Sequence, residues 1–157
     1  MQNPSLRKVK ESDITYFSKW WRDGDLISLT SGNKKLLSDK EVTKYFKFLL
    51  AREWEFMITI GAKTIGHISL VKRRNRWYET QIIIGDRKEW GKGYGTEAIK
   101  KILQKVKHSK IKNIYLEVRP NNIRAIRAYE KCGFKATKII NYPHNRNLPQ
   151  TVRMEYT

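Results

Sequence analysis

The sequence is poor in cysteine, in long apolar runs and in acidic residues, and each shortage excludes a class of protein. Cys132 is the only cysteine, so an internal disulfide is excluded, and one cysteine with three histidines lacks the spacing of a zinc site. No apolar run reaches the roughly 18 residues that a membrane-spanning helix needs. Residues 1–10 carry charge with no apolar segment behind them, which argues against a secretory signal. We therefore expect a cytoplasmic protein that binds no metal and does not interact with membranes.

Basic residues far outnumber acidic ones. Fifteen Asp and Glu stand against 33 Lys and Arg, which gives a formal net charge of +18. Such a charge attracts polyanions, so association with a ribosome or with RNA is one interpretation. A lysine-rich, solvated surface without a partner is the other. The densest basic cluster, residues 72–76, falls where the pattern predicts a hairpin turn.

The length and patterning predict one domain that covers residues 1–157. Hydrophobic residues make up 39% of the chain, enough for a core, and no repeat or linker divides it. From residue 54 the hydrophobic period changes to two, which predicts three antiparallel strands over 54–60, 65–71 and 77–84. The last strand ends in three isoleucines at 82–84, a continuous apolar run that predicts burial on both faces there.

Two helices are predicted before these strands. Apolar residues at helical spacing predict a first helix that is capped by Ser12 or Asp13. A second helix is predicted after the capping box that Ser38 opens. Gly24 and Gly32 predict a loop between the two helices.

The second half of the chain alternates between helices and strands. A glycine-rich segment over 90–95 leads into a helix, and a strand follows over 113–118. Another helix begins after Asn122, and strands near 136–140 and 151–156 complete the pattern. The order of elements predicts a mixed α/β fold.

The glycine-rich segment has the properties of a phosphate-binding loop. Glycines at alternate positions, from Gly91 to Gly95, let the backbone approach a ligand closely, and the free amides of the following helix point outward with the positive end of its dipole. Lys92 adds positive charge. No Walker motif follows, and Thr96 stands where the dinucleotide fingerprint needs glycine. A glycine turn that binds no ligand is the alternative.

Two motifs together resemble a known family. The order Trp90-Gly-Lys-Gly-Tyr-Gly after an apolar strand, and the later segment from Leu116 to Phe134 with Tyr129-Glu-Lys-Cys-Gly-Phe, resemble the GCN5-related N-acetyltransferases (GNAT). The strand that holds Glu117 resembles that of ribosomal-protein N-acetyltransferases. The resemblance implies the GNAT fold, a mostly antiparallel twisted sheet of about six or seven strands flanked by about four helices. Trp90 departs from the family pattern, which often has Gln or Arg there.

The same resemblance implies that acetyl-CoA is the cosubstrate and that its acetyl group passes to a primary amine by direct attack in a ternary complex. The backbone of Ile82 and Ile84 would pair with the pantetheine arm like an added strand. Asn122 would bind the same arm, and Arg124 and Arg127 would meet the nucleotide phosphates, with a solvated helix face as the alternative for at least one of them. The implied coenzyme-binding residues are Ile82, Ile83, Ile84, Trp90, Gly91, Lys92, Gly93, Tyr94, Gly95, Thr96, Asn122, Arg124, Ala125 and Tyr129.

Two residues are candidates for proton transfer. Tyr129 stands where the family has a tyrosine near the coenzyme sulfur, so its phenol is the candidate acid for the departing thiolate; packing of its helix on the sheet is the alternative. Glu117, in the middle of a strand, is the candidate base, because a carboxylate there is costly to bury unless it is paired or functional. A salt bridge with Arg119 or another basic residue is the alternative.

Other residues attract weaker hypotheses. His67 is interpreted as structural, and Cys132 is rejected as a nucleophile because no base is paired with it. Trp20, Trp21 and Tyr45 are interpreted as core residues, with an acceptor cleft as the alternative.

Several functions remain open from the sequence. The favoured acceptor is a protein N-terminal or lysine amine, and a polyamine or aminoglycoside is the alternative, since polycations are repelled unless acidic residues gather at the site. A basic nucleic-acid-associated module, or an acyl-CoA-binding module without turnover, is the alternative from another class. The expected assembly is a monomer or a homodimer.

Overall fold

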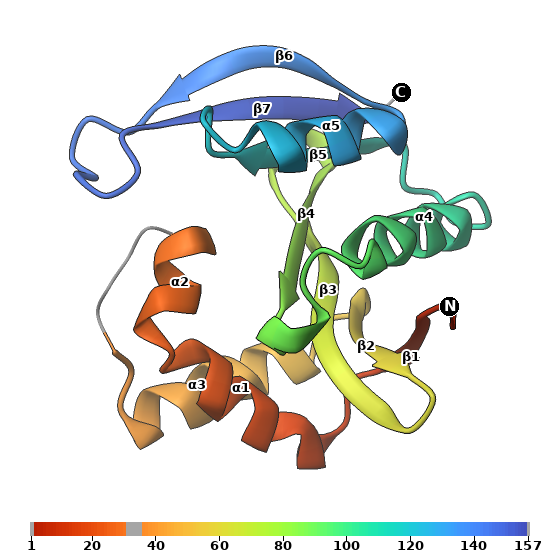
Figure 1. Cartoon of the computed structure of the whole chain (residues 1–157), viewed down its shortest axis with the longest axis vertical. Coiled ribbons are helices and arrows are strands. Elements are labelled where there is room, and N and C mark those ends of the chain that lie inside the picture. The colour runs from red at the N-terminus through yellow and green to blue at the C-terminus, as the bar shows by residue number, and fades with distance from the viewer. Residues whose placement is uncertain (1, 31–35, 157) are drawn as a thin grey trace.

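The computed structural model describes residues 2–30 and 36–156, so the predicted loop residue Gly32 lies outside the described residues. Seven strands form one sheet in the order β1-β2-β3-β4-β5-β7-β6 (Figure 1). The strands are β1 (Ser5–Lys8), β2 (Glu55–Ile60), β3 (Lys63–Lys72), β4 (Trp77–Ile84), β5 (Asn113–Val118), β6 (Phe134–Asn141) and β7 (Gln150–Tyr156). The helices are α1 (Ile14–Trp21), α2 (Gly24–Thr30), α3 (Asp39–Leu50), α4 (Tyr94–Val106) and α5 (Ile123–Lys131).

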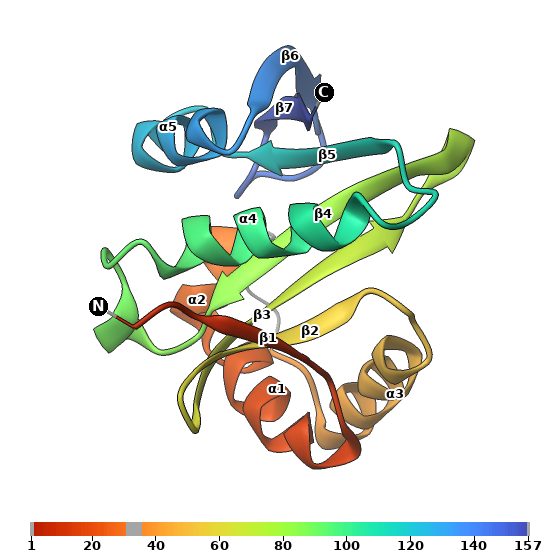
Figure 2. The same cartoon turned by 90° about the vertical axis from the view of Figure 1, so that its right-hand side faces the viewer.

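Helices cover both faces of the sheet (Figures 1 and 2). On one face, α1, α2 and α3 enclose a cluster of buried residues that includes Phe17, Phe46 and Met57. On the other, α4 and α5 pack on a larger core that includes Ile68, Ile102 and residues of both halves of the sheet. The predicted mixed α/β architecture and the number of strands are confirmed.

The described residues form five helices where about four were expected. The additional helix is α2, which begins at Gly24, so the predicted loop is wrong at this position. The Asp23 carboxylate accepts the Leu26 N–H at 3.2 Å, and Leu26 is buried with α1 and α3. Glycine costs little at a helix's first position, and burial of Leu26 outweighs that cost.

The helix starts on either side of α2 differ in how well the sequence predicts them. Ser38 caps α3 as expected, because its hydroxyl accepts the Glu41 N–H at 3.2 Å. The predicted side-chain cap of α1 is wrong: the Asp13 carboxylate turns back to accept the Lys10 N–H at 2.9 Å and pairs with Arg7 at 2.7 Å. Among the described helices, none combines the length and the hydropathy that crossing a bilayer requires.

The central strands separate part-way along the sheet. β4 and β5 are parallel and pair only from Trp77 to Glu79 and from Asn113 to Tyr115. Beyond these pairs, residues 82–84 of β4 are half-buried, so their predicted burial on both faces is wrong. Ile82 and Ile83 border the space between the separated strands.

Candidate active site

A cavity of about 740 Å³ opens where β4 and β5 separate. The sheet contributes residues 79–83 of β4 and 116–118 of β5 to its lining, and Tyr129 of α5 and Tyr142 of the β6–β7 connection lie at its walls. Trp21 of α1 and Tyr45 of α3 also line it, whereas Trp20 is buried beneath α1. The prediction of a core position is therefore confirmed for Trp20, whereas Trp21 and Tyr45 line the cavity.

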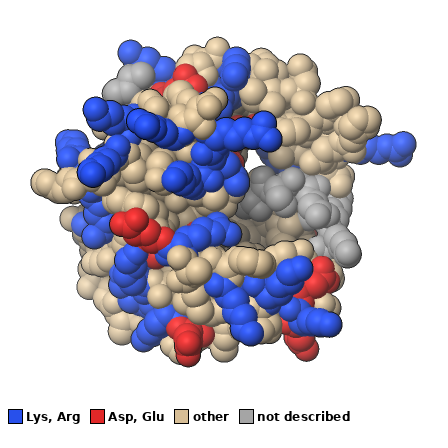
Figure 3. Space-filling view, turned by 180° about the vertical axis from the view of Figure 1, so that it is seen from behind, with Lys and Arg blue, Asp and Glu red and all other residues tan. Residues whose placement is uncertain are grey.

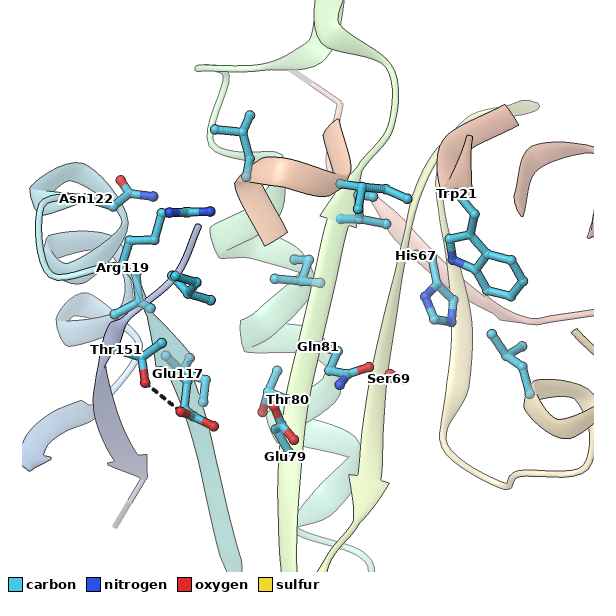
Figure 4. Close-up of a pocket in the computed structure, with 18 of the residues that line it drawn as sticks. Trp21, His67, Ser69, Glu79, Thr80, Gln81, Glu117, Arg119, Asn122 and Thr151 are labelled. Atoms are coloured by element: carbon cyan, nitrogen blue, oxygen red, sulfur yellow. Dashed lines mark hydrogen bonds between the residues drawn. The ribbon is translucent and has the colours of Figure 1, made fainter. Parts of the chain in front are cut away.

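Glu117 lies in this cavity and is held by two hydroxyl groups. Its Oε1 atom accepts a hydrogen bond from the Tyr142 hydroxyl at 2.5 Å. The same atom accepts a second hydrogen bond from the Thr151 hydroxyl at 2.5 Å (Figure 4). Hydrogen bonds to a carboxylate are among the stronger ones in proteins. The two donors therefore fix Oε1, whereas Oε2 accepts no hydrogen bond from a described residue.

No cation among the described residues pairs with Glu117. Arg153 faces it across the β5–β7 pair, but its guanidinium bonds to Glu155 at 2.8 Å and lies 3.7 Å from the centre of the Tyr115 ring. Arg119, the partner weighed from the sequence, donates instead to the carbonyl oxygens of Asn147, at 2.9 Å, and Ser28. The salt-bridge alternative for Glu117 is therefore wrong within the described chain.

Tyr142 reaches Glu117 because the β6–β7 connection is folded back on itself. Its N–H donates to the Pro149 carbonyl at 2.7 Å, and its own carbonyl accepts the Asn145 N–H at 3.0 Å. Burial and, next, the hydrogen bond to Glu117 raise the pKa of Tyr142 far above its ordinary value. The phenol thus remains a donor to Glu117 across the physiological pH range.

Tyr129 lies across the cavity from the helices α1–α3. Its ring packs against Phe134, with ring centres 6.3 Å apart, and its hydroxyl makes no hydrogen bond to a described residue. Burial, with a smaller contribution from Cys132, raises the pKa of Tyr129 above its ordinary value. The residue therefore both packs its helix and presents a protonated phenol at the cavity.

The glycine-rich loop lies against the end of β4, beside the cavity. Gly91 and Gly93 have φ values of +78° and +83°, which explains glycine at both positions. Gly93 also precedes the first turn of α4, whose free amides point outward with the positive end of the helix dipole. Tyr94 is buried in the core, so only its backbone remains for a ligand.

Arg124 of α5 reaches the glycine-rich loop at Gly91. A methyl group at Gly91 would lie 2.8 Å from the Arg124 Nη2 atom, which places the guanidinium of α5 directly over the loop. Lys92 is paired with Glu89 at 3.1 Å. Unlike Lys92, Arg124 has no carboxylate partner in the described chain.

Trp90 replaces the expected Gln or Arg with a different kind of contact. Its indole N–H donates to the Ile84 carbonyl at 2.7 Å, which ties the loop to the last residue of β4. That carbonyl already has one partner, so Ile82 is the freer backbone acceptor of the two. Asn122 is similarly engaged, since its side-chain oxygen accepts the Ala125 N–H at 3.2 Å and caps α5; its amide NH₂ donates to none of the described residues.

Several cavity residues were not predicted from the sequence. Glu55 is buried and pairs with His67 at 2.6 Å and with Arg52 at 3.2 Å, which gives His67 the structural partner that its interpretation needs. Ser69 lies beside this pair, and Tyr142 and Thr151 hold Glu117. Alternation along the predicted strands places His67 and Ser69 on one face, a weak signal that could have marked them.

Sequence comparison places the chain among acetyltransferases. Residues 5–135 match the acetyltransferase (GNAT) domain family. An aminoglycoside N(6')-acetyltransferase type 1 of Klebsiella pneumoniae is 22% identical over 156 aligned residues, which cover 88% of this chain and 77% of that protein. An uncharacterized protein of Methanocaldococcus jannaschii is 25% identical over 142 residues, covering 85% of this chain, and the match spans only 28% of that protein's length.

Solved structures share the fold. Spermidine N-acetyltransferase from Vibrio cholerae, in complex with CoA and spermine, superposes with a TM-score of 0.82 at 22% identity over 98% of this chain and 94% of that one. A GNAT acetyltransferase from Bacillus anthracis has the same TM-score at 19% identity and the same coverage. This match covers the segment that holds the separated strands and the glycine loop, and it confirms the resemblance seen in the motifs. The chain belongs to the GNAT acetyltransferase family.

Proposed function

We propose that this protein transfers the acetyl group of acetyl-CoA to a primary amine by direct attack in a ternary complex. One observation carries the proposal: Glu117, a carboxylate with no cation partner among the described residues, and Tyr129, a protonated phenol, line one cavity at the split between β4 and β5. The glycine loop lies at the end of β4. An acid, a base and a phosphate site are the groups that acetyl transfer from a CoA thioester needs.

Each residue has one role in the proposed mechanism. Backbone amides of residues 91–95 and the Arg124 guanidinium hold the pyrophosphate, and the backbone of Ile82 pairs with the pantetheine arm. Glu117, directly or through a water molecule, takes the proton that the amine loses as its nitrogen bonds to the thioester carbonyl carbon. The carbon–sulfur bond then breaks, and Tyr129 gives its proton to the departing thiolate.

The favoured acceptor remains a protein N-terminal or lysine amine, with a polyamine or aminoglycoside as the alternative. Three glutamates line the cavity, but Glu55 is paired with Arg52 and Glu79 with Arg73, at 3.2 and 2.7 Å. Among the described residues, Glu117 alone of the three has no cation, so the cavity offers one free negative charge. A single ammonium group matches that charge better than a polycation does.

The basic surface favours delivery of the acceptor by an anionic partner. Figure 3 shows Lys and Arg side chains scattered over the face seen from behind, with few acidic ones between them. Charges that are spread in this way produce a broad positive electrostatic potential over the surface, which is not concentrated in one groove. We propose that this potential holds an RNA-rich particle such as a ribosome near the cavity, in support of a protein acceptor.

Thiol release tests the proposed activity. The protein is incubated with acetyl-CoA and a panel of peptides, polyamines and aminoglycosides, and free CoA thiol is followed. Release that depends on an amine supports the proposal. Calorimetric heat with CoA but no release with any amine would indicate a coenzyme-binding module, and salt-dependent RNA binding without heat for CoA would indicate a nucleic-acid module.

Substituting Gly91 with alanine should weaken binding of CoA. The positive φ costs about 1–2 kcal/mol for a residue with a Cβ, and the new methyl group would displace the Arg124 guanidinium, which lies 2.8 Å away. We expect the calorimetric Kd for CoA to rise about tenfold or more. Gly24→Ala is the control, since Gly24 lies in α2 outside the loop and its Cβ would meet Leu36 at an ordinary 3.9 Å. Equal affinities of the two variants would contradict a phosphate role for this loop.

Substituting Tyr142 with phenylalanine should slow turnover without disturbing the fold. It removes one of the two hydroxyl donors to Glu117 and keeps the ring. Since a hydrogen bond to a charged group contributes about 1.5–3 kcal/mol, we expect kcat/KM to fall about tenfold. Tyr45→Phe, in the same cavity but without a bond to Glu117, should leave kcat/KM within about twofold of wild type. Steady-state kinetics that show no difference between the variants would remove Tyr142 from the site.

A further inference from the structure

A row of polar side chains crosses the sheet inside the cavity. Glu55 of β2 lies opposite Ser69 of β3, and Ser69 lies opposite Gln81 of β4. Across the split, Glu117 of β5 continues the row, because it stands two residues beyond Tyr115 as Gln81 stands two beyond Glu79. Figure 4 shows Glu117, Gln81 and Ser69 side by side on three strands.

Ser69 is the unusual member of this row. Ser69 is 1% exposed and lines the cavity, and its hydroxyl has no hydrogen-bond partner among the described residues. A buried hydroxyl without a partner is rare and destabilising, because it has lost its hydrogen bonds to water. Gln81, its neighbour across the strand pair, also makes no hydrogen bond to a described residue, and its amide faces the cavity. Two free polar groups therefore lie together in the middle of the row, between Glu55 and Glu117.

The charges at the two ends of the row differ. Glu117 has no cation partner among the described residues, so its end attracts an ammonium group. At the other end, beside Ser69, the carboxylate of Glu55 is already neutralised by Arg52 at 3.2 Å and bonded to His67 at 2.6 Å. An added cation would meet the Arg52 guanidinium there, whereas a neutral amide or hydroxyl would meet two unused hydrogen-bonding groups.

Strand spacing sets the distance from Ser69 to Glu117. Ser69 is two strands from Glu117, and neighbouring strands are about 4.8 Å apart, so the two residues are about 10 Å apart, or somewhat more across the split. That is about three residues of extended peptide. Along the same cavity, exposed Tyr45 and Phe48 of α3 offer aromatic surface to whatever joins the two groups.

We propose that Ser69 and Gln81 form a specificity subsite that hydrogen-bonds a neutral polar group of the acceptor, with Ser69 about 10 Å from Glu117. The inference rests on the proposed transferase activity and adds to it a requirement on the acceptor. A peptide amide and a sugar hydroxyl share the chemistry that the subsite recognises. A second ammonium group at that distance does not.

Three linear acceptors of matched length test the subsite: an alkylamine, the same chain ending in a hydroxyl, and the same chain ending in a second amine. With wild-type protein, we expect the amino alcohol to have the lowest KM. Ser69→Ala should raise KM for the amino alcohol about tenfold and leave KM for the alkylamine and every kcat unchanged. An alanine tripeptide amide and an amino disaccharide then distinguish the two sources, the true one showing the larger Ser69→Ala effect.

The outcomes separate the subsite from the activity. If the diamine is preferred, or if Ser69→Ala changes KM equally for the alkylamine and the amino alcohol, the subsite is overturned while the activity stands. If no acceptor releases thiol, the proposed activity fails and takes the subsite with it. The thermal midpoint of Ser69→Ala checks for a merely structural role: because the hydroxyl has no partner in the described chain, the midpoint should not fall.

Discussion

Replacing Glu117 with glutamine should lower kcat/KM about a hundredfold or more, because a general base contributes about 10²–10⁴ to rate. Glutamine keeps the shape of the side chain and can still accept hydrogen bonds from Tyr142 and Thr151. The variant therefore removes the negative charge and the proton acceptor and little else. Steady-state kinetics with a peptide acceptor measure the loss, and the thermal midpoint should stay close to that of wild type.

The acceptor sets how large this loss is. A lysine-type amine is neutral in only about one molecule in 2,500 at pH 7, whereas a protein α-amine is neutral to about 10–20%. A base therefore matters far more for the first class, and the loss from Glu117→Gln should be larger for lysine acceptors and steeper at low pH. A pH–rate profile parallel to that of wild type would argue that Glu117 only positions the acceptor.

Glu79→Gln provides the matched control for Glu117→Gln. Glu79 lies in the same cavity on the neighbouring strand, but its carboxylate pairs with Arg73 at 2.7 Å. Removal of that charge should affect kcat/KM much less than the loss at Glu117. If the two variants lose activity equally, the general negative charge of the cavity matters, and the free carboxylate has no special role.

The sequence predicts best the features that depend on local periodicity. The order of strands and helices, the capping box at Ser38 and the glycine loop all follow from residues that are close together in the chain. Glycine at positions 91 and 93 is explained by positive φ values that other residues rarely adopt. The helix α2 was missed because glycine was interpreted as a breaker, although the burial of Leu26 decides the structure there.

The details of the site depend on contacts that no local pattern encodes. Tyr142 and Thr151 are 25 and 34 residues from Glu117, and only the pairing of β5 with β7 and the folded β6–β7 connection bring them together. The row from Glu117 to Ser69 likewise depends on strand register. Alternation could place each polar residue on a face of its own strand, but the partner strand and its register come from tertiary packing.

Replacing Tyr129 with phenylalanine should lower kcat about a hundredfold, within the range observed when a general acid is lost. The ring contact with Phe134 remains, and the hydroxyl has no partner to lose among the described residues, so stability should not fall. The coenzyme Kd should also stay the same, because the phenol acts on the thiolate as it leaves. Stopped-flow or steady-state thiol release gives kcat, and calorimetry gives the Kd.

The pH dependence of the wild-type enzyme tests the same assignment independently. Burial raises the pKa of Tyr129 above its ordinary value near 10, so the folded protein holds this proton more tightly than a free phenol does. The acid form therefore persists as the pH rises, and kcat should show no basic limb below about pH 10. A basic limb well below that, unchanged in Tyr129→Phe, would assign the acid to another group.

Tyr156→Phe separates a catalytic phenol from a packing one. Tyr156 packs against the same Phe134 ring, with ring centres 5.6 Å apart, but lies outside the cavity lining. Both substitutions remove one hydroxyl beside one shared aromatic partner, so a purely structural effect would be similar in the two variants. A loss of kcat in Tyr129→Phe alone would therefore have to come from what the Tyr129 hydroxyl does in the cavity. Equal rates in both variants would leave Tyr129 as a core residue, and the thiolate would then take its proton from solvent.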